Sequence, residues 1–587
     1  MMEKRWVIKE KGDELLVRNL AQELKINEKL SNLLVCRGIK TYQEAHAFFR
    51  PELSHLHDPF LMKDMDLAIN RINQAIANHE RILVYGDYDV DGTSAVALVF
   101  SFLQSVYKEN KLDYYIPDRY LEGYGVSYKG IDFAADNKFK LIICLDCGIK
   151  AVDQVAYAKN KGIDFIVCDH HRPGDVLPEA IAVLDPKRKD CAYPFKELSG
   201  CGIGFKLAQA YVQENKMPFH TLESYLDLVV ISIASDIVPI IGENRVLAFY
   251  GLKQFNSKPR PGLEAILSFS GIKSVDSQIS TEQKFARQLN INDLVFLIGP
   301  RINAAGRIEN GKKSVELLLS MNSEAAKDIG DYINKNNTER KNLDTSITQA
   351  ALDMIMADKM QTFKKSTVVY QPDWHKGVVG IVASRLIENF YRPTIVLTQS
   401  NGLITGSARS VKDYDIYDAI DACSDLLEHF GGHKYAAGLS LKPENLKAFV
   451  EKFEKIVSET ITDDMLIPQV EIDEELELTD ISPSFYRILK QFAPFGPGNM
   501  APVFLTKGLV DKGYARIVGN NHLRFSVMYP GIFNPEYNAI AFGQADYLQL
   551  LSEKKKFDVC YHIDENEWNG TTSLQLMIKD IKPNRLK

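Results

Sequence analysis

The feature that most constrains the fold is a short apolar run followed at once by closely spaced aspartates, in residues 82–100. This stretch reads ILVYGDYDVDGTSAVALVF. The apolar run predicts a buried parallel strand, and Thr93 with the small residues after it predicts the start of a helix. The aspartates would then lie at the carboxyl end of a strand, where open α/β sheets bind ligands. They repel one another unless a cation neutralises them, so the stretch indicates a metal site; a solvated acidic turn that caps the helix is the alternative.

Three later apolar runs also end in polar side chains, and a helix pattern at residues 152–161 separates the first two. The runs are KLIICL before Asp146, DFIVC before Asp169, His170 and His171, and LDLVVISIA before Ser235 and Asp236. We interpret all three as strands. Alternating strands and helices predict a doubly wound parallel sheet, so the polar groups at the strand ends would converge on one crevice.

Carboxylates combined with imidazole suit Mn²⁺ or Mg²⁺, and the imidazole favours Mn²⁺. Two ions about 3.5–4 Å apart need a carboxylate shared between them, and five or six ligands can provide it. The predicted ligands are Asp89, Asp91, Asp146, His170 and Asp236, with Asp87 as a further candidate. For Asp87, a helix cap or a group that supports a ligand is the alternative.

Composition sets broad limits on the class of protein. The 587 residues are too many for one core and predict several domains, and 45% hydrophobic with 25% charged residues is ordinary for a globular protein. The N-terminus lacks the apolar core of a signal peptide, and no long uncharged apolar run predicts a membrane span. The eight scattered cysteines fit reduced thiols, so we expect a cytoplasmic location; Cys144 and Cys147 are interpreted as core residues beside Asp146. A net charge of −7 argues weakly against nonspecific coating of nucleic acid but does not exclude a nucleic-acid enzyme.

Several ordered motifs carry a family resemblance. GDYDVDG, LDCG, DHH and SIASDIVP resemble the motifs of the DHH phosphoesterase superfamily. GPRINAAGR, WHKGVVGIVASR, GSARS and GGHKYAAG resemble those of its RecJ single-stranded-DNA exonucleases and their DHHA1 domain. The resemblance runs from about residue 65 to the C-terminus, and so many motifs in order make it specific.

The resemblance and the patterns together predict an α/β protein with a parallel-sheet DHH lobe, a long connecting helix, a smaller α/β DHHA1 lobe and a C-terminal OB-type β-barrel. Short strands at regular spacing support the barrel. The expected boundaries are 1–60 for an N-terminal helical segment, 61–322 for the DHH catalytic domain, 323–360 for the helix, 361–460 for DHHA1, and 461–587 for an OB-like domain that binds nucleic acid. Residues 292–307 are expected to form a strand-like run and then a turn.

The resemblance also implies roles for the metal-site residues. Asp146 would bridge two Mn²⁺ or Mg²⁺ ions, Asp89 would hold one, and Asp91, His170 and Asp236 would complete the other. His171 would face the scissile phosphate, and we count His171, Asp146 and Asp169 as the catalytic candidates. Many family members have a histidine four residues before the first aspartate of the DxD pair, where this chain has Tyr85. One ion would therefore have fewer protein ligands here, or Asp87 would compensate.

A second set of residues would bind DNA. Ser407 and Arg409 resemble the family's pocket for a 5′-terminal phosphate, because an arginine fork and a hydroxyl suit phosphate oxygens. Arg119, Arg301, Arg307 and His433 would contact the strand nearby; solvated or structurally paired arginines are the alternative. Lysines at 554–556 and 579–587 would add positive charge for DNA or only for solubility.

The resemblance implies a single-stranded-DNA-specific 5′→3′ exonuclease that releases mononucleotides by two-metal hydrolysis and acts in DNA recombination and repair. It would be a monomer without membrane contact, and a helicase and a single-strand-binding protein are candidate partners. The alternatives are a DHH-family oligonucleotide phosphodiesterase or phosphatase and an inactive DNA-binding scaffold. Chain length argues against the first. The second is disfavoured because every expected ligand residue except the optional histidine at the position of Tyr85 is present.

Overall fold

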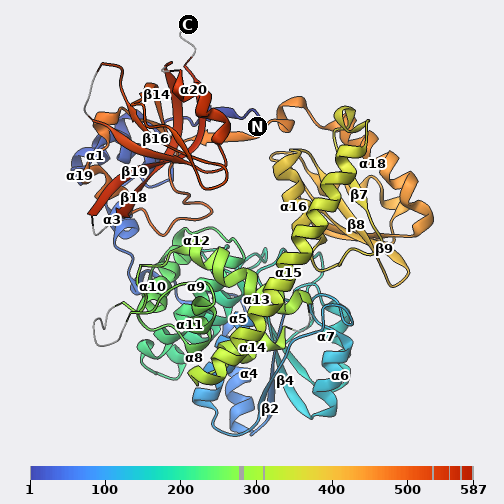
Figure 1. The fold of residues 1–587 in the computed structure, drawn as a ribbon. Coiled ribbons are helices and arrows are strands. Elements are labelled where there is room, and N and C mark those ends of the chain that lie inside the picture. Colours follow the sequence, from blue (N-terminus) through green and yellow to red (C-terminus); the bar gives the residue numbers. More distant parts are fainter. Residues whose placement is uncertain are drawn as a thin grey trace. The chain divides into compact units, whose positions relative to one another are not determined.

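The computed structural model describes residues 2–275, 283–308, 311–531, 535–553, 555–568 and 571–584 (Figure 1). The chain forms two compact units. One comprises Ala47–Arg340 with Pro494–Met500, and the other comprises Met1–His46, Lys341–Ala493 and Ala501–Lys587.

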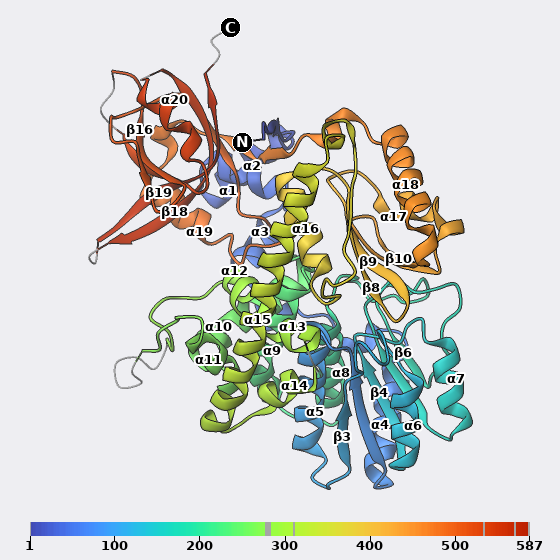
Figure 2. The same ribbon diagram turned by 45° about the vertical axis from the view of Figure 1, so that its right-hand side comes forward.

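The first unit contains a parallel sheet with the strand order β3-β2-β4-β5-β6. Its strands are β2 (Arg81–Gly86), β3 (Leu112–Tyr115), β4 (Phe139–Leu145), β5 (Asp164–Cys168) and β6 (Ala182–Leu184). Helices α4 (Met65–Ala77), α5 (Val90–Val106) and α8 (Gly200–Glu214) cover one face, and α6 (Tyr128–Asp136) and α7 (Val152–Asn160) cover the other (Figure 2).

Side chains alternate between the two faces of each strand. In β2, Ile82 and Val84 join the core on the α5 side, whereas Leu83 and Tyr85 join the core on the α6 side. The predicted doubly wound parallel sheet is confirmed, and its carboxyl edge carries Asp87, Asp146 and Asp169.

Two predictions of strands in this unit are wrong. Residues 226–235 form helix α9 (Leu226–Ser235), and Asp236 is its C-cap. Every residue from Leu226 to Ala234 is buried, and a helix that is buried on all sides has no polar face to reveal its period. Residues 292–307 are also helical: they span α12 (Ile291–Asp293), the π-helix η4 (Leu294–Ile298) and α13 (Gly299–Ile308).

Further helices complete the first unit and lead into the second. They are α10 (Gly242–Ser257), α11 (Pro261–Ser268), α14 (Lys312–Leu319) and α15 (Ser323–Ala357). The long helix α15 confirms the predicted connector, and its residues are divided between the two units.

The second unit contains a mixed sheet with the order β10-β11-β9-β8-β7. Its strands are β7 (Thr367–Tyr370), β8 (Thr394–Ser400), β9 (Leu403–Arg409), β10 (His429–His433) and β11 (Ala436–Leu441). Helix α16 (Val379–Asn389) and the last turns of α15 pack on one face, and α17 (Ile416–Asp421) and α18 (Leu446–Thr460) pack on the other.

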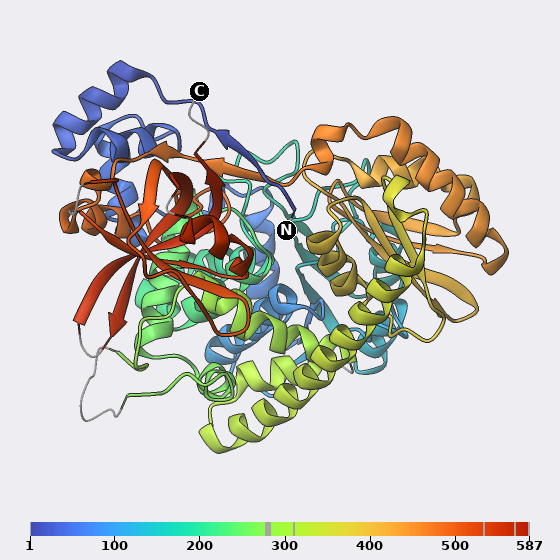
Figure 3. The same ribbon diagram turned by 45° about the horizontal axis from the view of Figure 1, so that its top comes forward.

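A β-barrel forms the C-terminal part of the same unit. It contains β14 (Phe504–Asp511), β16 (His522–Met528), β17 (Tyr537–Ala541), β18 (Phe557–Trp568) and β19 (Thr571–Pro583). The order β14-β18-β19-β17-β16 closes into a ring because β14 also pairs with β16 (red in Figure 3). The predicted OB-type barrel is therefore confirmed. Lys554 and residues 585–587 lie outside the described residues.

The N-terminal segment is not wholly helical, in contrast to the prediction. Helices α1 (Glu14–Leu24), α2 (Glu28–Val35) and α3 (Tyr42–Phe49) follow strand β1 (Arg5–Ile8), which pairs in parallel with β12 (Gln469–Ile472). All eight cysteines are free thiols, and Cys36 is the exposed one. Within the described residues, no helix combines the length and apolar character needed to cross a membrane.

Candidate metal centre

Asp91 is held from two sides at the start of α5. Its carboxylate accepts hydrogen bonds from the backbone N–H groups of Gly200 and Cys201, both at 2.7 Å, in the first turn of α8. The hydroxyl of Ser232 on α9 donates a third bond at 2.7 Å. Because helix N-termini bind acidic groups through their free N–H groups, α8 fixes the direction of this carboxylate.

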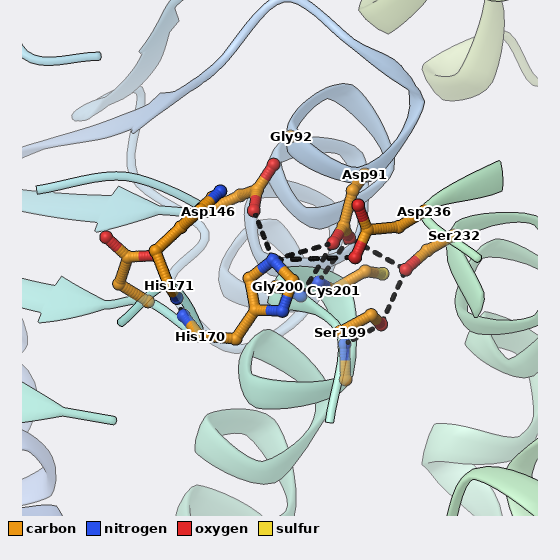
Figure 4. A network of polar contacts seen from close by, with 12 residues as sticks. Asp91, Gly92, Asp146, His170, His171, Ser199, Gly200, Cys201, Ser232 and Asp236 are labelled. Carbon is orange, nitrogen blue, oxygen red and sulfur yellow. Dashed lines mark hydrogen bonds and ion pairs between the residues drawn. The ribbon is translucent and has the colours of Figure 1, made fainter. Parts of the chain in front are cut away.

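His170 lies among three carboxylates that come from separate parts of the chain (Figure 4). Its Nε2 atom is 3.2 Å from Asp146 Oδ1, 3.6 Å from Asp236 Oδ2 and 3.7 Å from Asp91 Oδ2. Asp91, Asp146 and His170 are buried, and Asp236 is partly exposed. The structure thus brings four of the predicted ligands together.

The electrostatics of this cluster favour a bound cation. Burial, and then repulsion by Asp91 and Asp89, raise the pKa of Asp146 well above its usual range. Burial and the same two neighbours raise the pKa of Asp236 to about 8. Burial lowers the pKa of His170, which keeps its imidazole neutral and able to coordinate a metal.

The donor atoms also fit a metal. Among the described residues, Asp146 Oδ1 and both ring nitrogens of His170 are buried without a hydrogen-bond partner. Leaving such atoms unpaired is costly. Asp91, His170 and Asp236 can bring one donor atom each within 4.8 Å of one another, and so can Asp146, His170 and His171. Carboxylate and imidazole donors suit Mn²⁺ and Mg²⁺, so the residues fit the expected ions.

Asp169 and His171 form a hydrogen-bonded pair beside this cluster. The buried Asp169 carboxylate accepts from His171 Nδ1 at 2.8 Å and from the N–H groups of Ile149, His170 and His171. Burial would raise the pKa of Asp169, but these bonds, led by that of His171, hold it below its usual range. Burial alone would lower the pKa of His171, but the bond to Asp169 raises it to about 9. In the metal-free protein His171 therefore holds its second proton to a higher pH than an ordinary histidine does.

The other two aspartates of the acidic turn lie differently. Asp89 is the N-cap of α5 and accepts from the N–H of Gly92 at 3.0 Å. Asp87 is buried, and its Oδ1 has no hydrogen-bond partner among the described residues. Burial, and then Asp89, raise the pKa of Asp87. Neither contact tests whether Asp87 or Asp89 binds a metal, so both roles stay predictions.

The arginines expected to bind DNA differ in how many contacts their guanidinium groups already make within the protein. Arg119 is half-buried, with its guanidinium 5.1 Å from the centre of the Tyr88 ring. Arg301 is buried and donates to Leu297 O at 2.7 Å and Asn334 Oδ1 at 3.1 Å, so much of its fork is used within the protein. Arg307 lies in the last turn of α13 and is half-buried.

Ser407, Arg409 and His433 belong to the second unit. On β9, Arg409 Nη1 donates to Ser407 Oγ at 2.8 Å, and burial lowers the pKa of Arg409. Both side chains contact the first turn of α16: a Cβ on Gly380 would lie 3.0 Å from Ser407 Oγ and 3.1 Å from Arg409 Nη2. Guanidinium, hydroxyl and helix N-terminus together suit a phosphate. His433 is exposed on the edge strand β10.

Comparisons with known proteins agree with this arrangement. The DHH family, N-terminal domain, matches residues 81–233, the DHHA1 domain matches 363–459, and the RecJ OB domain matches 472–580. The single-stranded-DNA-specific exonuclease RecJ of Bacillus subtilis (strain 168) is 34% identical over 579 residues, which are 98% of this chain and 70% of that one. RecJ of Escherichia coli (strain K12) is 32% identical over 571 residues, covering 94% of this chain and 96% of that one. This chain belongs to the RecJ family.

A solved RecJ structure supports the same assignment. The crystal structure of RecJ in complex with Mn²⁺ from Thermus thermophilus matches with a TM-score of 0.82 at 25% identity, over 99% of this chain and 80% of that one. The expected RecJ family, the fold class and the class of metal-dependent exonuclease are thereby confirmed.

Tyr85, at the position where the resemblance led us to expect a histidine, makes its contacts with a loop rather than with the acidic cluster. Its hydroxyl donates to Gly125 O at 3.0 Å and accepts from Ser127 N–H at 3.1 Å, and its ring stacks on Tyr115. The side chain therefore fastens the 125–127 loop against the sheet.

Replacing Tyr85 with phenylalanine is expected to lower the free energy of unfolding by about 1–3 kcal/mol, because a buried N–H loses its acceptor. Urea titration measures this loss, and Tyr42→Phe, an exposed tyrosine of α3, is the matched control. Mn²⁺ affinity should stay unchanged; a clear fall in affinity would mean that Tyr85 contributes to the metal site.

The sequence did not reveal three groups near the site. Asp185, at the end of β6, is fully buried with Oδ2 unpartnered among the described residues, and burial raises its pKa to about 7. Tyr124 shares a hydrogen bond of 3.1 Å with His171 Nε2, and Ser232 binds Asp91. The apolar run before Asp185 and the glycines on either side of Tyr124 are the signals that could have identified the first two.

Proposed function

We propose that this chain degrades single-stranded DNA from its 5′ end and releases mononucleotides with the help of two divalent cations. The observation that carries the proposal is the position of His170 Nε2 among three carboxylates, with unpaired donor atoms on Asp146 and His170. Membership of the RecJ family supports the choice of substrate.

The residues divide the chemistry between metal binding and phosphate binding. Asp89, Asp91, Asp146, His170 and Asp236 would hold Mn²⁺ or Mg²⁺, with Asp146 between two ions and Asp87 as a further candidate. Such ions polarise a phosphoryl oxygen and lower the pKa of bound water. Asp169 fixes Nδ1 of His171, and the Nε2 atom, which pairs with the Tyr124 hydroxyl in this structure, would exchange that partner for a phosphate oxygen. A preorganised donor of this kind stabilises charge that develops in the transition state.

The Ser407–Arg409 pair beside α16 would bind the 5′-terminal phosphate. Arg119, Arg301, Arg307 and His433 would contact the rest of the strand, although Arg301 would first have to release internal partners. The OB-like barrel would hold the single strand by stacking and charge.

Arg409→Lys tests the 5′-phosphate pocket. Lysine keeps the charge but loses the fork, so we expect the preference for 5′-phosphorylated over 5′-hydroxyl single strand to fall about tenfold. The measurement compares kcat/KM for the two substrates. Arg18→Lys, on the exposed face of α1, is the matched control. An unchanged preference in Arg409→Lys would place the pocket elsewhere.

One digestion experiment separates the proposed activity from its alternatives. Wild-type protein with Mn²⁺ is offered 5′-phosphorylated single strand, the same sequence as duplex, a dinucleotide and pyrophosphate. We expect rapid digestion of the single strand only. Preference for the dinucleotide would favour an oligonucleotide phosphodiesterase, preference for pyrophosphate would favour a small-substrate phosphatase, and no digestion would favour an inactive scaffold.

We also propose the cellular setting that the RecJ resemblance implies. The chain would act in the cytoplasm as a monomer in DNA recombination and repair. A helicase and a single-strand-binding protein would supply its substrate. Sedimentation of the purified protein tests the monomer, and digestion of duplex in the presence of a helicase tests the supply of single strand.

A further inference from the structure

A helix distant in sequence holds the acidic turn in place. Val90, the first residue of α5, lies between Asp89 and Asp91, and its N–H donates to Asn303 Oδ1 at 3.2 Å. Asn303 lies on α13, 213 residues further along the chain. The first N–H groups of a helix have no partner within the helix, so this side chain satisfies a donor that α5 leaves open.

The same helix meets the turn at a second point. Gly306, one turn after Asn303, packs against the backbone of Tyr88: a Cβ on Gly306 would lie 2.8 Å from Tyr88 O. A side chain there would force that backbone to shift. Helix α13 therefore contacts the turn on both sides of Asp89, by packing at Tyr88 and by a hydrogen bond at Val90.

The two carboxylates depend on the backbone between them. The oxygens of Asp91 are bound by α8 and α9, and an oxygen of Asp89 caps Gly92 within α5. These bonds fix the directions of the two carboxylates, but none of them involves the Val90 N–H, which is paired by Asn303 instead. Rotation of the peptide between Asp89 and Val90 would shift the backbone that carries both side chains, and the Asp91 carboxylate lies only 3.7 Å from His170 Nε2.

We propose that Asn303 is a positioning residue for the metal site, whose amide oxygen fixes the peptide between Asp89 and Val90 and so the direction of both carboxylates. The inference rests on the proposed metal site. Groups that orient metal ligands from outside are typically worth about 10–100-fold in metal affinity or activity.

Two substitutions of Asn303 distinguish the effect of its hydrogen-bond acceptor from the effect of its side-chain shape. Asn303→Leu keeps a similar shape without an acceptor, and Asn303→Asp keeps an acceptor oxygen in the same place. Asn160→Leu, exposed at the last residue of α7, makes the same chemical change away from the site. Mn²⁺ binding to the full chain, without DNA, is measured by isothermal titration calorimetry.

We expect Asn303→Leu to bind Mn²⁺ about 10–100-fold more weakly and Asn160→Leu to bind like the wild type. Asn303→Asp, which keeps the acceptor and adds a negative charge beside the carboxylates, should bind at least as tightly as the wild type. At saturating Mn²⁺, Asn303→Leu should recover cleavage with an unchanged KM for DNA. If Asn303→Leu does not fold by circular dichroism, Asn303→Ala, which leaves room for water, takes its place.

The outcomes distinguish this inference from the proposed function. Wild-type affinity in Asn303→Leu, or equally weak binding by Asn303→Asp and Asn303→Leu, would overturn the role of Asn303 alone. Absence of Mn²⁺ binding by the wild type would overturn the proposed metal site, and the positioning role with it.

Discussion

Asp146→Asn is expected to lower the rate of single-strand digestion on the order of 10³-fold and, at the same time, to raise the melting temperature of the metal-free protein. Activity falls because the amide is a poor metal ligand in the place of the proposed shared carboxylate. Stability rises because the amide replaces a carboxyl group whose ionisation is opposed by burial and by repulsion from Asp91 and Asp89. Asparagine is the suitable replacement because Asp146 has φ +59°, a left-handed conformation that asparagine tolerates.

Digestion assays and calorimetry in EDTA measure the two effects. Asp136→Asn, an exposed aspartate at the end of α6, is the matched control and should change neither quantity. Wild-type activity in Asp146→Asn would remove Asp146 from the site, and a lower melting temperature without metal would contradict the repulsion.

The metal-free protein is expected to lose stability as pH rises from about 4 to about 9, and Mn²⁺ is expected to abolish this loss. The pKa of Asp236 is raised to about 8 and that of Asp185 to about 7, from about 3.9 in an unfolded chain. The folded state therefore holds protons that the unfolded state has released, and its stability falls as pH rises towards those values.

His171 acts in the same direction. Its pKa of about 9 lies above the unfolded value of about 6.5, so its contribution is complete below pH 6.5 and is lost as pH rises to 9. Each such proton contributes a slope of at most about 1.4 kcal/mol per pH unit.

Thermal unfolding at each pH, in EDTA and in Mn²⁺, measures the effect. Asp236→Asn should flatten the slope in EDTA, and Asp153→Asn, an exposed aspartate in the first turn of α7, should not. Mn²⁺ should raise the melting temperature most at high pH, where protons no longer compete for the carboxylates. A melting temperature in EDTA that does not change with pH would contradict the raised pKa values of these groups.

The strand ends on β2, β4 and β5 were predictable because loops and solvated helices rarely contain an apolar run that stops at a carboxylate or imidazole. Each run was long enough to distinguish a strand from a loop. Strand β6 has only three residues, so the run before Asp185 was too short to identify. The run before Asp236 failed for the opposite reason: complete burial of α9 removed the polar face that identifies a helix.

The supports of the site could not be read from the sequence. Asn303 accepts a hydrogen bond from Val90, which lies 213 residues away in the sequence. The N–H groups of Gly200 and Cys201 donate to Asp91, which lies more than 100 residues away. Such pairs follow from tertiary packing rather than from a local pattern. The sequence therefore located the carboxylates and histidines, and the structure located the groups that orient them.

Gly200 has a consequence for the order in which the site can be made. Its N–H binds Asp91, and its Cα packs so closely on Asp146 that a Cβ would lie 2.6 Å from Asp146 Cβ. During synthesis, residues 82–171 leave the ribosome first. At that stage the chain contains the carboxylates that repel one another, but it lacks α8, which binds Asp91, and it lacks Asp236. The proposed ligands are therefore brought together with their supports only after residues 82–236 have left the ribosome, when less than half of the 587 residues have been made.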